Sequence, residues 1–127
     1  MENRSLRQMI WKTIRLELAR TDGFPNGSVG RAYLLRLPLD ECGRVDLDIY
    51  QNHPERATVR RYWPNEPDRN GYLIYRQGGW VFSYAVNDPG DVTPLNLESH
   101  PFRLDENLVI TEHDGTRLPF RVASCDS

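Results

Sequence analysis

Residues 72–85 read YLIYRQGGWVFSYA. Aromatic residues occupy every second position after Gly78-Gly79, and Tyr72–Gln77 forms a second largely apolar run before it. Successive side chains of a strand point to opposite faces, so each run predicts a strand with one buried face. Two glycines between them tolerate the positive φ of a tight turn, which predicts an antiparallel hairpin.

The same two-residue period continues along the chain. Asp114-Gly115 separates Leu108–Glu112 from Arg117–Ala123 and predicts a second hairpin. Further alternating rows run through Ile14–Leu18, Tyr33–Leu39, Val45–Ile49 and Leu118–Val122. About eight short strands with short connections favour an all-β fold: a single antiparallel β-barrel or strongly curved meander, with a β-sandwich as the alternative.

The N-terminal segment fits two structures. Ser5-Leu6-Arg7-Gln8 matches a helix capping box, which predicts a short helical turn over Ser5–Ile10. From Lys12 the residues alternate as a strand, and we expect that strand to span Lys12–Arg20. The segment is polar and its apolar part is short, so we expect no signal peptide and a cytoplasmic protein.

Composition limits the class of protein. The chain has 127 residues, 39% of them hydrophobic and 27% charged, with a net charge of −2. This length supports one domain, residues 1–127, and the acidic balance disfavours nucleic acid as a partner. No apolar run is long enough to span a membrane. The two cysteines and three histidines lie in no metal-binding or catalytic spacing, so we expect no metal, no cofactor and no catalytic residues.

The densest group of arginines and aromatics lies between residues 60 and 80. Alternation places Arg61 in the same row as Val59 and Trp63, and a buried guanidinium needs a partner because an unpaired interior charge is strongly unfavourable. That partner is an acid such as Asp46 or Asp48, or an anionic ligand held beside aromatic faces. The expected ligand-binding residues are Arg60, Arg61, Trp63, Arg69, Tyr75, Arg76 and Trp80.

Alternatives for these side chains remain open. The same mixture stacks single-stranded bases in small barrels, but the interleaved acids Glu55, Glu66 and Asp68 would repel phosphate. Asp46-x-Asp48 also resembles a hard-cation site, although two acids on a wet strand face need no metal. Aromatics at outward or ambiguous positions would mark a protein partner or a homodimer contact; they are Trp11, Tyr50, Tyr62 and Tyr75.

The sequence therefore favours a non-enzymatic binding module for a small anionic or aromatic ligand or a protein partner. One alternative is an enzyme that uses carboxylates or a histidine in a pocket at the mouth of the barrel. Another is a structural or interaction module without a ligand pocket. A concave site that holds at least three of the expected residues would separate these hypotheses.

Overall fold

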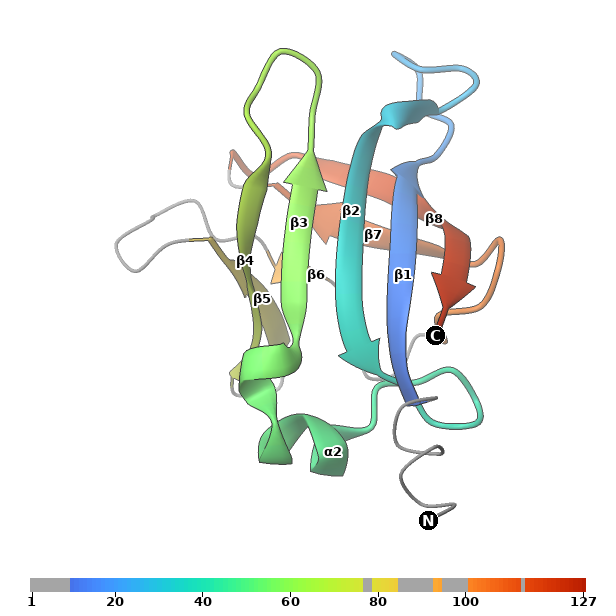
Figure 1. Ribbon diagram of the computed structural model, residues 1–127. Coiled ribbons are helices and arrows are strands. Elements are labelled where there is room, and N and C mark those ends of the chain that lie inside the picture. Colours follow the sequence, from blue (N-terminus) through green and yellow to red (C-terminus); the bar gives the residue numbers. More distant parts are fainter. Residues whose placement is uncertain (1–9, 77–78, 85–92, 95–100, 113) are drawn as a thin grey trace.

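Each strongly alternating segment but one is a strand, and the strands form one antiparallel sheet (Figure 1). A computed structural model of the protein describes residues 10–76, 79–84, 93–94, 101–112 and 114–127. Within them the strand order is β5-β4-β3-β2-β1-β8-β7-β6. The strands are β1 (Trp11–Leu18), β2 (Ser28–Pro38), β3 (Thr58–Tyr62), β4 (Arg69–Arg76), β5 (Gly79–Ser83), β6 (Thr93–Pro94), β7 (Asn107–Thr111) and β8 (Arg117–Asp126).

The sheet curls strongly into a half-barrel, which confirms the predicted all-β curved meander. In Figure 1, β1 to β4 run side by side, while β7 and β8 cross behind them. Irregular pairing in β1, between Arg15 and Leu16 toward β8 and between Glu17 and Leu18 toward β2, adds local twist. The edge strands β5 and β6 consequently come close to each other.

Gly71 lets β5 fold tightly against β4. A Cβ atom built on Gly71 would lie 2.1 Å from the carbonyl oxygen of Ser83 and 2.7 Å from the Cα of Tyr84. Real Cβ atoms essentially never approach another atom so closely. A glycine is therefore needed at this position for the sheet to bend, a use that glycines within strands commonly have.

The concave side of the sheet holds the core. Inward residues of every strand from β1 to β5, together with β7 and β8, are buried in one cluster that includes Leu35, Phe82 and Phe120. Tyr33 packs its ring 5.2 Å from those of both Phe82 and Phe120. The large apolar area removed from water on this side is the main stabilising contribution to the fold.

The expectation of a strand over Val45–Ile49 is wrong. The chain forms helix α2 (Leu47–Asn52) there, followed by the 3-10 helix η1 (Pro54–Arg56). Asp46 is the N-cap, and its carboxylate accepts a hydrogen bond of 3.2 Å from the backbone N–H of Ile49. This cap satisfies one of the free donors of the first turn, so a short helix is stable where the apolar spacing alone suggested a strand.

Trp11 and Tyr50, which the sequence placed at outward or ambiguous positions, are also buried. The Tyr50 ring packs 4.7 Å from Trp80, and its hydroxyl donates a 2.9 Å hydrogen bond to the carbonyl oxygen of Leu73. Because Tyr50 points from α2 into the core, the helix closes the lower end of the half-barrel as drawn in Figure 1. These two aromatics are therefore unavailable for a homodimer contact.

Both predicted hairpins form, but the first is shifted by one residue. Gly79, predicted as a turn residue, belongs to β5 and pairs with Arg76, so residues 77–78, which lie outside the described part of the chain, connect the two strands. Gly115 adopts a φ of +89° between β7 and β8, as a tight turn requires. The predicted first strand is present as β1 and ends at Leu18, whereas the helical turn over Ser5–Ile10 lies outside the described residues except for Ile10.

Candidate functional site

Strand β3 sends its two neighbouring arginines to opposite faces of the sheet. Arg61 is only 5% exposed and points to the concave side, whereas Arg60 is exposed on the convex side. This follows from the two-residue alternation of a strand, because consecutive side chains leave opposite faces. The two residues therefore belong to different parts of the molecule and cannot grip one ligand.

Arg61 lies in a polar group that we call the inner cluster, formed with the buried Tyr33 and Glu112 and the exposed Glu66. Its Nη2 donates a 3.0 Å hydrogen bond to Glu112 Oε1, and its Nη1 donates one of 2.9 Å to Glu66 Oε1. Its Nε donates to the hydroxyl of Tyr33 at 3.3 Å, and that hydroxyl donates to Glu112 Oε2 at 2.5 Å. Glu112 is 6% exposed, so the two carboxylates compensate an almost fully buried cation.

Burial and neighbouring charges shift the pKa values of Arg61, Tyr33 and the nearby Tyr84. Burial alone would lower the pKa of Arg61, but Tyr33 and Glu112 outweigh it and hold that pKa above its usual range. Burial, together with neighbouring Tyr84 and Glu112, raises the pKa of Tyr33 above its usual range. Burial also raises the pKa of Tyr84. Arg61 therefore stays charged and both tyrosines stay neutral at physiological pH.

The partner of Arg61 was predicted correctly in kind and wrongly in position. An acid pairs with it, as expected, but neither Asp46 nor Asp48 does. Asp46 instead caps helix α2, and Asp48 is exposed in the first turn of that helix. Because the Nε, Nη1 and Nη2 atoms of Arg61 already donate to the protein's own oxygens, this side chain has little left to offer a ligand.

Aromatic rings surround the inner cluster on the concave side. The Arg61 guanidinium stacks 4.0 Å from the centre of the Trp63 ring, and that of Arg69 lies 4.5 Å from the centre of the Tyr84 ring. The buried Tyr84 hydroxyl has no hydrogen-bond partner among the described residues. Arg61, Trp63 and Arg69 thus gather near one end of the core, where cation–π contacts stabilise them.

The remaining expected site residues lie elsewhere. Tyr75 and Trp80 pair across β4 and β5 with ring centres 5.1 Å apart. Trp80 belongs to the hydrophobic core, and its buried indole N–H has no acceptor among the described residues. The side chain of Arg76 lies outside the described part. Of the six expected residues whose side chains are described, Arg60 lies on the convex face and the other five lie on the concave side.

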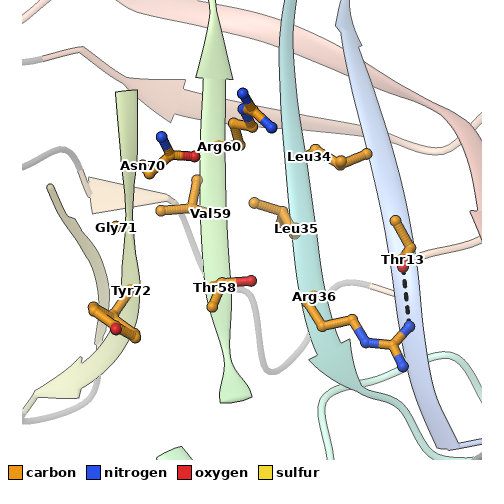
Figure 2. Close-up of a pocket in the computed structure, with 10 residues that line it drawn as sticks. All are labelled: Thr13, Leu34, Leu35, Arg36, Thr58, Val59, Arg60, Asn70, Gly71 and Tyr72. Carbon is orange, nitrogen blue, oxygen red and sulfur yellow. Dashed lines mark hydrogen bonds between the residues drawn. The ribbon is translucent and has the colours of Figure 1, made fainter. Parts of the chain in front are cut away.

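A hollow of about 590 Å³ lies on the convex face across β1 to β4, and we call it the outer groove (Figure 2). The strand register arranges its outward side chains in two rows that cross the strands. One row consists of Thr13, Arg36, Thr58 and Tyr72. The other consists of Leu34, Arg60 and Asn70.

Positive charge dominates the outer groove. Arg36 and Arg60 line it, and no acid is among its lining residues. Arg36 Nη1 donates a 2.9 Å hydrogen bond to the hydroxyl of Thr13, which orients its guanidinium. Arg60 has one acidic neighbour among the described residues, Asp68, at 3.5 Å on the exposed rim. Such an exposed pair contributes little, so Arg60 can exchange Asp68 for a stronger anionic partner, and Arg36 can exchange the hydroxyl of Thr13 for one.

The groove combines these cations with apolar and hydrogen-bonding side chains. Tyr72 is 52% exposed, a large exposure for an aromatic residue, and the half-buried Leu34 lies two strands away in the other row. Thr58, which pairs with Arg36, and Asn70, which pairs with Arg60, add hydrogen-bonding groups next to the arginines. Figure 2 shows Arg60 and Arg36 at different heights along the strands, with Leu34 level with Arg60 on the neighbouring strand β2. The arrangement suits an anion that carries an apolar part.

Other sites receive less support from the described residues. The described residues include no group of three metal-ligating side chains and no helix long and apolar enough to cross a membrane. Cys42 and Cys125 are free thiols in this structure. The protein partner or homodimer that the sequence left open and the expected cytoplasmic location stay predictions.

No protein family, curated protein or solved structure matches this chain. The geometry of the inner cluster and of the outer groove is therefore the basis for assigning a function.

Proposed function

We propose that the protein is a non-enzymatic binding module that takes an anionic group with an apolar neighbour in the outer groove. The observation that carries this proposal is a hollow of about 590 Å³ lined by Arg36 and Arg60 and by no acid, on a chain whose net charge is −2. A local concentration of positive charge on an acidic protein favours a specific anion over nonspecific attraction.

Guanidinium groups are suited to this task. Each presents several N–H donors in a planar fork that matches a carboxylate or phosphate, and each stays charged at any physiological pH. Either Tyr72 or Leu34 can cover the apolar part of the bound molecule while Thr58 or Asn70 donates a hydrogen bond. The groove is open to solvent along one side, so the fit favours moderate rather than very tight affinity.

Catalysis is the alternative function, and the inner cluster is the observation that favours it. Glu112 and Tyr33 lie 2.5 Å apart, which is within the range for proton transfer. Both carboxylate oxygens of Glu112 already accept hydrogen bonds within the cluster, and Tyr33 is fully buried. We therefore assign the cluster to the stability of the fold and keep binding as the function.

A thermal-shift titration tests the proposal. A ligand that binds only the folded state must raise the melting temperature, so phenyl phosphate and benzoate should raise it at millimolar concentration while benzyl alcohol should not. The Arg36→Gln and Arg60→Gln variants should lose the shift. The Arg103→Gln variant removes an exposed arginine outside the groove and should keep it.

Two results would contradict the assignment. A shift that persists in the Arg36→Gln/Arg60→Gln double variant places the anion elsewhere on the molecule. The absence of a shift with either anion would contradict the proposal that the groove binds small anions at all.

A further inference from the structure

The two arginines of the outer groove have a fixed spacing. Arg60 pairs with Leu34 across β2 and β3, and Arg36 pairs with Thr58 across the same two strands. The arginines are therefore one strand apart and two residues apart along the strand direction. Strands lie about 4.8 Å apart and rise about 3.3 Å per residue, which puts the two Cα atoms about 8 Å from each other.

An extended peptide repeats nearly the same spacing. Its side chains at i and i+2 leave the same face and lie about 6.7 Å apart. The long side chains of Arg36 and Arg60 can accommodate the remaining difference. We propose that the outer groove binds an acidic peptide segment in extended conformation, with two carboxylates at i and i+2; this rests on the proposed function and names its ligand.

The rest of the groove fits the same occupant. A peptide that follows β2 and β3 would place one carboxylate at Arg60 and the other at Arg36, and both pairs would be charge-assisted hydrogen bonds. Leu34 and the exposed ring of Tyr72 lie on either side of the line that joins the two arginines, where they border the bound peptide. Residue i+1 would point to solvent, so its identity should matter little.

The charges favour a peptide over single-stranded nucleic acid. Arg15, which continues the row of Leu34, is already paired with Glu17 at 2.8 Å. Two arginines remain for the ligand, which matches two carboxylates, whereas nucleic acid carries a phosphate at every nucleotide. Asp68 at the rim would repel further phosphates, while a peptide with neutral flanks would avoid that repulsion.

Fluorescence anisotropy with labelled peptides tests this inference on the full chain. One peptide carries aspartates at i and i+2, and a second of identical composition carries them at i and i+3. The first should bind about tenfold more tightly, which corresponds to about 1.4 kcal/mol. Labelled oligothymidylate serves as the nucleic-acid probe and should bind more weakly than the first peptide.

Substitutions of the two arginines test whether the peptide binds in the outer groove. Arg36→Gln and Arg60→Gln should each weaken binding of the first peptide about tenfold, a loss of about 1.4 kcal/mol, and Arg103→Gln should leave it unchanged. The Arg36→Glu/Arg60→Glu variant should instead bind a peptide with lysines at i and i+2. This exchange would establish the contacts independently of any loss of stability, because a variant that gains a new ligand is folded.

The results distinguish the proposed anion-binding groove from the more specific inference of a peptide with acids at i and i+2. Equal binding of both peptides, with loss in the arginine variants, would overturn the spacing inference and leave an anion-binding groove. Tighter binding of oligothymidylate would overturn the choice of a peptide. No binding of the peptides or of phenyl phosphate would overturn the proposed function together with this inference.

Discussion

Replacing Glu112 with leucine should destabilise the protein strongly, because it leaves the buried guanidinium of Arg61 with only Glu66. Glu112 accepts a 3.0 Å hydrogen bond from Arg61 and a 2.5 Å hydrogen bond from Tyr33, and it is 6% exposed. Breaking a buried ion pair by removing one partner costs about 3–5 kcal/mol. Glu66 retains part of the compensation, so we expect about 3 kcal/mol from the lower end of that range.

A double-mutant cycle in urea separates this charge effect from lost packing. Arg61→Met should also cost about 3–5 kcal/mol, since it leaves a buried carboxylate. The double variant Arg61→Met/Glu112→Leu should cost only about 1–3 kcal/mol, mainly for the unpaired hydroxyl of Tyr33. The coupling energy is then at least about 3 kcal/mol, at the upper end of what contacting pairs show.

An exposed ion pair provides the matched control. Arg121 and Asp105 lie 2.9 Å apart, which is as close as the buried pair, but both side chains are exposed. Removing either should cost at most about 1 kcal/mol. The claim that the buried part of the inner cluster is a mutually dependent network would be refuted by either of two results. One is that the destabilisations of Arg61→Met and Glu112→Leu simply add in the double variant; the other is that each is as small as that of the control variants.

Three further predictions concern the fold. Gly71→Ala should destabilise by about 1–3 kcal/mol or more in urea, because its Cβ would meet the Ser83 carbonyl, while Gly23→Ala should be nearly neutral since nothing lies within 4 Å. Asp46→Ala should lower the free energy of unfolding by about 1 kcal/mol because it removes the cap of α2. A loss of less than about 0.3 kcal/mol would contradict that role. The raised pKa of buried Tyr33 means that the folded chain keeps a proton that the unfolded chain loses. The contribution of Tyr33 to stability is therefore complete below about pH 10 and declines as the pH rises. In Tyr33→Phe, the free energy of unfolding should fall less steeply above that pH, by about 1.4 kcal/mol per pH unit. An unchanged slope would contradict the raised pKa of Tyr33.

Local patterns in the sequence predicted most of the strands. Alternation and glycine-containing turns are short-range signals, so the hairpins that join β4 to β5 and β7 to β8 could be read without knowing the fold. Helix α2 could not be distinguished from a strand by its apolar residues alone. The deciding signal was Asp46, which caps the helix and which we had interpreted as an outward acid of a strand.

Long-range pairing limited the prediction of the sites. The burial of Arg61 and its need for an acid followed from alternation within one strand. Alternation also indicates that Glu112 points inward, since it follows Leu108 and Ile110 at two-residue intervals. Nothing in the local sequence, however, shows that this row lies opposite β3. Arg36 and Tyr72 were missed because the outer groove exists only through the register of β1 to β4.

Chemical-shift mapping of the 15N-labelled protein with the peptide that carries aspartates at i and i+2 tests the central claim most directly. The outer groove should account for the response: amide shifts should concentrate on the middle of β2 and β3 and around Tyr72, and residues of β7 and β8 should stay unchanged. Shifts centred on the inner cluster or on the far side of the sheet, with the groove unaffected, would contradict the claim that this protein binds its partner on the convex face.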